Sequence, residues 1–441
     1  MQLKNKKSVR QSLASATASL LAISGQANGA AGNEIEFNAS TLYYAEDKRV
    51  TVNKFQNQLR IPLREEEFLN IDVIYDTMTG ATPNGSFISK ESAAAFVAGT
   101  SQSTYTFASG FSIPISGGGG GADKIAVADW LTEFEDKRIA LTTDLEKPLT
   151  SHLLGNYSAS ISREEDYTSV GASTQFKWDI NQRRTTLSLG ANFNNDQIHP
   201  SFGVYEPGSA VRCDDSKYFP GTPTCGPART IESANKVVSS FLAGITQIWN
   251  RSSIVQFNYS YTINDGFLTD PYKMTSISEV VPDQTLREKR PDHRVAQSLY
   301  LKVVNVITPS QKSLNSSARF FWDDWGIRSL TIDSRFIRDL SSKHTYQIHA
   351  RANYQTAADF FTLNLKHDET TQIGALPPEF FSSDHRIGEQ LTLTSGAKYM
   401  YNTKGLGKIG MRVEYMYQNY YENNLPNMGV WIIQALLNFK F

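Results

Sequence analysis

The chain is poor in cysteine, in net charge and in long apolar runs, and each absence narrows the class of protein. Two Cys among 441 residues are too few for a disulfide scaffold, and a formal net charge of −1 gives no reason to expect nucleic acid as a partner. Beyond the N-terminal region no stretch approaches roughly 18 consecutive apolar residues, which excludes a helical membrane protein. Length alone would predict two or three soluble domains.

The two cysteines, Cys213 and Cys225, lie in one segment rich in Pro and Gly. In an oxidising compartment they could close a single loop disulfide. The alternative is two separate thiols.

The N-terminal region has the layout of a secretory signal peptide. A basic leader with Lys4, Lys6, Lys7 and Arg10 precedes the uncharged run from Ser12 to Gly25, and the small residues of "QANGAAG" follow. The apolar run is too short to anchor the chain in a bilayer. We therefore predict a signal peptide over residues 1–31, cleaved after Ala27 or Ala31, and a mature chain over residues 32–441.

From Glu34 onward the dominant pattern is an alternation of apolar and polar residues. In "HTYQIHARANYQT", Tyr346 and Ile348 share one face, while His349 and Arg351 share the other. Successive side chains of a strand point to opposite faces, so such a segment has one apolar and one polar side. Helical spacing of apolar residues never persists beyond about two turns. The chain is therefore predicted to be all-β.

The alternation predicts about sixteen strands, with boundaries uncertain by a few residues. Their spans are 34–46, 48–62, 68–77, 130–146, 149–163, 165–179, 183–196, 237–249, 252–264, 294–308, 312–325, 327–340, 343–356, 388–402, 407–420 and 428–441. Every join after an even-numbered strand is short. The long joins all follow odd-numbered strands: 78–129, 197–236, 265–293 and 357–387.

This sorting of loop length is typical of bacterial outer-membrane barrels, which have short periplasmic turns and long outer loops. In lipid an unpaired backbone group costs several kcal/mol, so a spanning sheet must close on itself. We predict a transmembrane antiparallel up-and-down β-barrel in the outer membrane of a Gram-negative bacterium. Its apolar face would contact outer-membrane lipid.

The last strand and the aromatic residues support the same interpretation. The segment "WIIQALLNFKF" alternates to its end, and its terminal Phe441 resembles the recognition signal that delivers barrels to the bacterial barrel-assembly machinery. Aromatic residues near strand ends are expected to form interfacial girdles: Tyr43, Phe176, Trp178, Trp249, Tyr399, Tyr401, Tyr415 and Tyr417.

The inward-facing positions carry many charges, which we expect to line a polar, water-filled passage. The alternative is a lumen filled by mutually paired side chains. The predicted lining residues are Lys54, Arg60, Asp72, Arg138, Asp144, Lys302, Arg319, Asp333, Arg335, His349, Arg351, Lys398, Arg412 and Glu414. The segment 78–129, with the flexible Gly-rich run from Ser116 to Ala122, could either fold into the lumen or remain a mobile outer loop.

No catalytic motif stands in a fitting context, so we expect no enzyme, no cofactor and no metal site. Barrel enzymes with a rim histidine exist, and an outer-rim hydrolase is therefore the third interpretation. The loop histidines concerned are His199, His293, His367 and His385.

Three segments resemble the hallmark motifs of an uncharacterised family of bacterial outer-membrane proteins, a domain of unknown function. They are "DTMTGATPNG" (76–85), "DGFLTDPYK" (265–273) and "EKRPDHR" (288–294), and the resemblance extends from about Glu34 to Phe441. It implies a signal peptide, a large barrel and Gram-negative origin, but no substrate. It also implies gene neighbours that encode a small lipoprotein and a flavin-attaching enzyme, and hence a role beside redox proteins.

These motifs lie where strands leave the bilayer, and we expect them to form one folded cap over the outer rim. The expected residues are Asp76, Gly80, Pro83, Gly85, Asp270, Pro271, Tyr272, Arg290 and Arg294. "TGATPNG" is interpreted as a rim turn, because Gly permits positive φ and Pro fixes a bend. Asp270 is expected to pair with Arg290 or Arg294 and so to pin the loops 78–129 and 265–293.

The sequence therefore predicts a channel or transporter for small polar solutes. The alternative is a non-conducting scaffold barrel that docks a periplasmic lipoprotein or a redox partner.

Overall fold

A computed structural model describes residues 34–47, 49–64, 66–83, 104–106, 112–114, 131–209, 230–277, 285–307, 312–365, 378–403, 407–422 and 425–440. The predicted signal peptide, Cys213, Cys225, Gly85, His367, the Gly-rich run from Ser116 to Ala122 and the terminal Phe441 lie outside these residues. Among the described residues, no helix is both long enough and apolar enough to cross a membrane.

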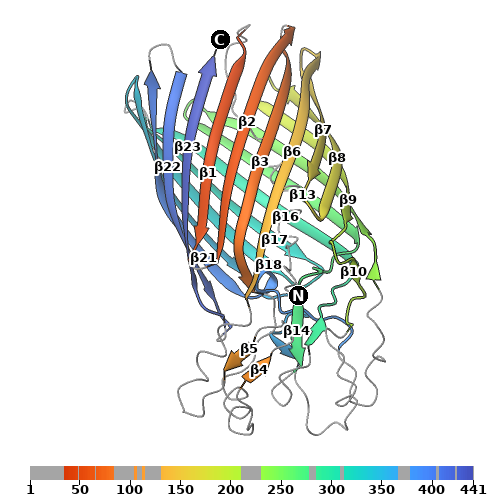
Figure 1. Cartoon of the computed structure of the whole chain (residues 1–441). Coiled ribbons are helices and arrows are strands. Elements are labelled where there is room, and N and C mark those ends of the chain that lie inside the picture. Colours follow the sequence, from red (N-terminus) through yellow and green to blue (C-terminus); the bar gives the residue numbers. More distant parts are fainter. Residues whose placement is uncertain are drawn as a thin grey trace.

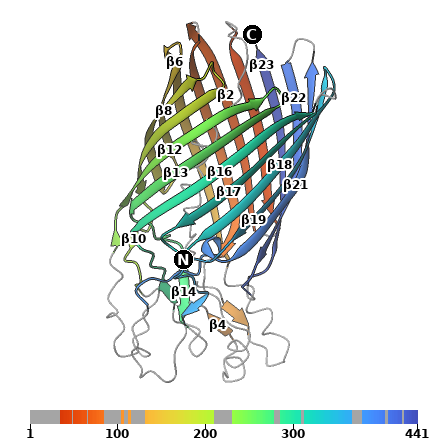
Figure 2. The same ribbon diagram turned by 180° about the vertical axis from the view of Figure 1, so that it is seen from behind.

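Sixteen antiparallel strands form one closed barrel (Figure 1 and, from behind, Figure 2). In order around the barrel they are β1 (Glu36–Glu46), β2 (Val50–Arg64), β3 (Glu67–Pro83), β6 (Leu131–Thr150), β7 (Leu153–Arg163), β8 (Tyr167–Ile180), β9 (Thr185–Ile198), β12 (Ala234–Asn250), β13 (Ser253–Gly266), β16 (His293–Ile307), β17 (Lys312–Asp323), β18 (Arg328–Ser341), β19 (His344–Gln355), β21 (Gln390–Thr403), β22 (Gly407–Tyr420) and β23 (Met428–Lys440). The last strand pairs with the first, from Glu36↔Lys440 to Glu46↔Val430, and this pairing closes the sheet. The predicted fold class and strand number are confirmed.

The two ends of the barrel differ. At one end, here the turn end, joins of a few residues connect the strands. The first residue of β1 and the last residue of β23 also lie at this end (Figure 1). The four longest joins, 84–130, 199–233, 267–292 and 356–389, all connect strand ends at the opposite end of the barrel, here the loop end. The alternation of loop length in the sequence therefore corresponds to the two mouths of the barrel.

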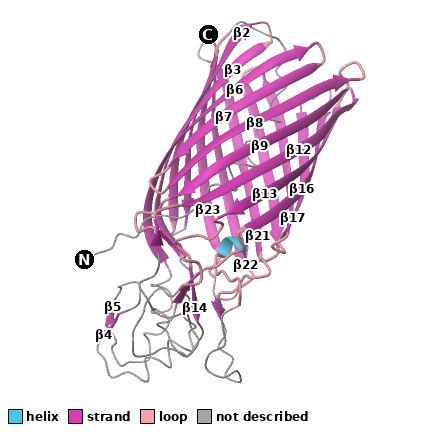
Figure 3. Cartoon of the chain, turned by 90° about the vertical axis from the view of Figure 1, so that its right-hand side faces the viewer, coloured by secondary structure: helices cyan, strands magenta, loops and turns pink. Residues whose placement is uncertain are grey.

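Short elements occupy the loop end (Figure 3). They are β4 (Thr104–Thr106), β5 (Ser112–Pro114), β10 (Val204–Tyr205), β11 (Thr230–Ile231), β14 (Met274–Ile277), β15 (Thr285–Arg287), β20 (Asn364–Leu365) and the 3₁₀ helix η1 (His385–Ile387). Strand β14 pairs antiparallel with β15 and parallel with β20, so this small sheet joins the 267–292 and 356–389 loops.

Apolar side chains cover the outside of the barrel instead of filling its centre. Ile139, Leu189 and Ile348 are 58%, 62% and 61% exposed, and each lies in the middle of a strand. Buried apolar residues gather at the loop end, as in the cluster of Val50, Met78 and Phe134 and in that of Leu286, Leu365 and Phe381. A sheet whose apolar face looks outward fits a lipid environment.

The structure corrects the interpretation of "TGATPNG" as a rim turn. Strand β3 continues to Pro83, and residues 81–83 pair with residues 131–133 of β6. Gly80 has φ +131° within the strand, and a Cβ there would overlap the backbone carbonyl of Arg49. The glycine thus permits a close approach of two strands. Strand β3 continues past Gly80 because its pairing with β6 outweighs the local turn propensity of Gly and Pro.

Candidate functional site

The predicted lining residues lie on the face opposite the exposed apolar side chains. On β19, Tyr346 and Ile348 are 46% and 61% exposed, whereas His349 is 6% exposed. Side chains two strands apart can touch only on the concave side, as Arg60 of β2 and Glu146 of β6 do across β3. The concave face also carries the other predicted positions: Lys54, Asp72, Arg138, Asp144, Lys302, Arg319, Asp333, Arg335, Arg351, Lys398, Arg412 and Glu414.

On the wall formed by β2 to β8, each luminal cation has a carboxylate nearby. The neighbours are Arg138 with Asp76 at 2.6 Å, Arg60 with Glu146 at 3.4 Å, Lys54 beside Asp76 and Asp72, and Lys177 beside Glu146 and Asp179. Asp76, which the motif comparison assigned to the outer rim, therefore belongs to a luminal ion pair. Asp136 and Asp144 of β6 face the lumen as well, so carboxylates on this wall are at least as numerous as cations.

Figure 2 shows the opposite wall, formed by the barrel strands β16, β17, β18, β19, β21 and β22. Its sequence is rich in basic residues. The central part of its inner face carries six basic residues and two carboxylates: Lys302, Arg319, Arg335, Arg351, Lys398 and Arg412, with Asp333 and Glu414. Arg335 Nε lies 3.3 Å from Asp333 Oδ1, and Arg412 Nη1 lies 3.7 Å from Glu414 Oε1. We call this surface the basic wall.

A histidine joins the two carboxylates of the basic wall. His349 Nε2 lies 2.7 Å from Asp333 Oδ2, and its Nδ1 lies 2.8 Å from Glu414 Oε1. The second contact crosses β21 at Gly396, where a Cβ would collide with Glu414 Cγ and the carbonyl of Val413. Both ring nitrogens can donate only in the imidazolium form, so this arrangement favours a charged histidine between two anions.

At the loop end, six charged side chains form a buried network that we call the cap cluster. It consists of Asp270, Lys273, Glu288, Arg290, Asp384 and Arg386. Its ion pairs include Arg290 with Glu288 at 2.8 Å, Arg290 with Asp384 at 2.7 Å, Arg386 with Asp270 at 2.6 Å and Arg386 with Asp384. Three acids and three bases balance, so the cluster can be removed from water without a net charge.

Glu288 and Asp384 experience different environments within the cap cluster. Glu288 is 0% exposed, and burial raises its pKa even though Arg290 opposes the shift. Burial also disfavours ionisation of Asp384, but the charges of Arg386, Lys273 and Arg290 outweigh it and hold the pKa of Asp384 well below its usual value. Ser382 Oγ donates to Glu288 Oε2 at 2.5 Å, and Glu288 Oε1 accepts from the backbone N–H of Asp270.

These contacts correct the pairing expected for Asp270. Its carboxylate binds Arg386 instead of Arg290 or Arg294. Arg294 binds Asp323 at the end of β17 and lies 4.5 Å from the Trp325 ring. The loops that meet are therefore 267–292 and 356–389, because a carboxylate buried to 3% exposure takes the guanidinium that reaches it with a suitable geometry.

Apolar and polar contacts hold the two loops of the cap cluster together and pack them against the β17–β18 turn. Ile387 packs with Ile327 and Ala358, and the backbone N–H of Ala358 donates to the carbonyl of Ile387 at 2.8 Å. Phe381 is 1% exposed, and burial of such a side chain contributes about 2 to 3 kcal/mol. Arg287 Nη1 donates to the Pro271 carbonyl at 3.3 Å, which secures the motif backbone.

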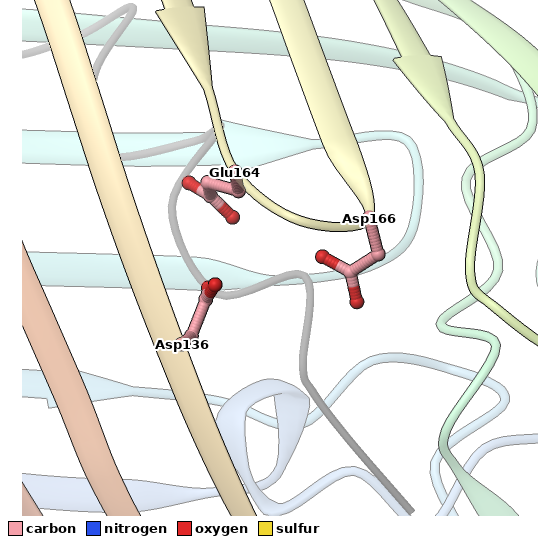
Figure 4. Close-up of side chains that lie close together, drawn as sticks. All are labelled: Asp136, Glu164 and Asp166. Carbon is pink, nitrogen blue, oxygen red and sulfur yellow. The ribbon is translucent and has the colours of Figure 1, made fainter.

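A second acidic group lies at the loop end (Figure 4). Asp136 of β6 and Glu164 and Asp166 of the β7–β8 turn have carboxylate oxygens within 4.8 Å of one another. Burial and then the charge of Asp136 raise the pKa of Glu164 to about 9, so Glu164 is protonated at neutral pH. Oxygen ligands suit hard cations, but a proton on Glu164 already relieves the repulsion. Tyr272 Oη donates to Asp166 Oδ2 at 2.5 Å and ties the 267–292 loop to this turn.

Sequence reasoning did not identify Glu164, Asp166, Asp384 or Arg386. A signal for the last two was present, because "DHR" occurs both in the motif at 292–294 and again at 384–386. Of the loop histidines considered for a hydrolase, His199 contacts Thr168 Oγ1 at 3.1 Å and His293 contacts Asp265 at 2.5 Å. His385 packs edge-on against Tyr420.

No curated protein is similar to this chain. Among solved structures, a variant of the ferric enterobactin receptor PfeA from Pseudomonas aeruginosa is 10% identical with a TM-score of 0.40, and the match covers 88% of this chain and 54% of that one. OpdK from the same organism, with vanillate, is 7% identical with a TM-score of 0.40, covering 92% and 98%. CdiB from Acinetobacter baumannii is 6% identical with a TM-score of 0.46, covering 93% and 61%. The chain thus spans about half the length of PfeA.

These similarities are too weak to carry information about activity. The comparison with protein families is more specific, because a family model described as "Protein of unknown function (DUF3570)" matches residues 10–434. That match includes all three motifs and nearly the whole barrel. The chain therefore belongs to the DUF3570 family.

Proposed function

We propose that the protein lies in the outer membrane of a Gram-negative bacterium and conducts small polar solutes through its barrel. The observation that carries the proposal is the combination of a closed barrel, an apolar outer surface and a charged inner surface. An apolar outer face would be costly in water but favourable in lipid, while luminal charges require water or solutes around them. The proposal involves no catalytic step, cofactor or metal.

The experiment is a conductance measurement on purified protein reconstituted in planar bilayers. Slower gel mobility after boiling reports that the barrel was folded before reconstitution. We expect discrete current steps from the folded protein and none from the boiled sample. Cell fractionation should place the protein with outer-membrane markers.

The cap cluster favours one second candidate, a barrel that conducts nothing and docks a partner. Two loops, 267–292 and 356–389, are tied together at one mouth by buried ion pairs, and such a cover would restrict passage. A folded preparation of both the wild type and a variant with a weakened cap, Glu288→Gln, would then give no current. If a stoichiometric lipoprotein or redox protein also co-purified, the scaffold function would replace the channel.

A further inference from the structure

We propose that the basic wall selects anions, and that the solutes crossing the barrel carry carboxylate or phosphate groups. This inference rests on the proposed channel function and adds a substrate class to it. The evidence for it is that several cations of the basic wall have no ion-pair partner among the described residues.

Four of the six basic residues have no ion pair among the residues that the structure describes. They are Lys302, Arg319, Arg351 and Lys398, and they come from four different strands. The two carboxylates within reach are already used, because His349 contacts both Asp333 and Glu414. Arg335 and Arg412 lie beside the same two carboxylates, and Arg351 lies opposite Asp333 on the neighbouring strand without forming an ion pair with it. The wall therefore has a net positive charge that its own side chains do not neutralise.

Like charges lie close together on this wall. Arg319 experiences repulsion from Arg351, and Lys398 experiences repulsion from Arg412 and Arg335. Holding cations together without counter-ions is unfavourable, and an anion between them removes the repulsion. The same positive charges repel a cation in the lumen with a similar energy.

The donors on this wall suit oxyanions. The Nε atoms of Arg319 and Arg412 are buried and have no hydrogen-bond partner among the described residues. A guanidinium presents a planar set of donors that matches carboxylate and phosphate oxygens with two parallel bonds. The Arg319 guanidinium lies 5.6 Å from the Phe321 ring, which limits its orientation. A halide could use the charge of this wall but not the paired donor geometry.

The opposite wall explains why the effect is local. There Arg138 and Arg60 are bound to carboxylates, so their charge is largely cancelled. A solute in the lumen thus encounters a positive surface on one side and, on the other, a surface whose carboxylates are at least as numerous as its cations. Selectivity should depend on the four unpaired cations and not on the total number of basic residues.

The test is the reversal potential of the reconstituted protein in a potassium chloride gradient. We expect the wild type to prefer chloride over potassium. The variant Lys302→Gln/Arg319→Gln/Arg351→Gln/Lys398→Gln should lower the permeability ratio of chloride to potassium by about fivefold. The reason is that a change of roughly one kT in the electrostatic energy of an ion in the lumen disfavours chloride and favours potassium. The matched control removes four exposed cations at the turn end: Arg184→Gln/Arg251→Gln/Arg338→Gln/Lys343→Gln. It should change the ratio by much less.

Competition identifies the chemical class. Added succinate or inorganic phosphate should reduce the chloride current of the wild type, and the luminal variant should lose this sensitivity. Inhibition by succinate alone indicates carboxylates, and inhibition by phosphate alone indicates phosphates. If neither anion competes, the oxyanion assignment is wrong.

The outcomes separate the two proposals. If the folded wild type and the Glu288→Gln variant both carry no current, the channel function fails. If current flows without chloride preference, or if the preference survives the luminal substitutions, the channel remains and the anion selectivity is refuted. Should the quadruple variant not fold, the double variants Lys302→Gln/Lys398→Gln and Arg319→Gln/Arg351→Gln should each give part of the shift, and unchanged ratios in both would refute the inference.

Discussion

The cap cluster and the basic wall use the same residue types in opposite ways. In the cap cluster, Glu288 and Asp384 are buried against Arg290 and Arg386, and the charges balance. On the basic wall, cations outnumber carboxylates six to two. A charge removed from water must be paired, whereas a charge in a hydrated lumen need not be. The comparison suggests that paired charges hold loops together and unpaired charges act on solutes.

The largest expected effect comes from breaking the pairing in the cap cluster. Glu288→Gln leaves Arg290 with less compensation and removes a charged acceptor from Ser382 and Asp270. Loss of one partner of a buried pair costs about 3 to 5 kcal/mol, which should appear as local opening of the loop end. Hydrogen exchange in detergent should show faster exchange in the 267–292 and 356–389 loops.

The control for this experiment is Glu422→Gln, an exposed glutamate at the same end of the barrel. It should leave the exchange rates of both loops unchanged. Equal rates in Glu288→Gln and the wild type would show that the cap cluster does not hold the loops.

A smaller effect is expected from separating His349 and Glu414, a paired histidine and carboxylate on the basic wall. Gly396→Ala places a methyl group against Glu414 and the backbone of Val413, which should separate Glu414 from His349. Overpacking of this kind costs about 1 to 3 kcal/mol in the free energy of unfolding. Urea denaturation in detergent should show the loss.

Gly190→Ala provides the matched control, because Gly190 also faces the lumen but its nearest neighbour to an added Cβ is 3.6 Å away. It should be close to neutral. A similar destabilisation of both variants would mean that the His349 contact contributes nothing beyond the general cost of losing a glycine.

The last expected effect is a dependence on pH and concerns the acidic group at Glu164, where a proton on Glu164 relieves the repulsion between carboxylates. Its pKa is raised from the usual 4.5 to about 9, so the folded protein binds more protons than the unfolded chain between these values. Stability of the loop end should therefore fall as pH rises from about 4.5 through 9. Melting temperatures measured across this range should decline less in Glu164→Gln, and parallel declines in the variant and the wild type would contradict the assignment.

The sequence revealed the strands and the faces because both depend on local alternation. Ile348 and His349 lie on opposite faces of β19 because a strand is pleated, and this holds wherever the strand lies in the barrel. Local turn signals were less reliable, since Gly80 and Pro83 lie in β3 where pairing with β6 extends the strand.

The sequence by itself determined a closed barrel of sixteen strands, with apolar residues outside and charges inside, because period two and the sorting of loop length are properties of neighbouring residues. Only the tertiary structure decided which charges are paired. Asp270 and Arg386 are 116 residues apart, and His349 and Glu414 are 65 apart. Such pairs depend on how loops and non-adjacent strands meet in space, which residue spacing along the chain does not specify.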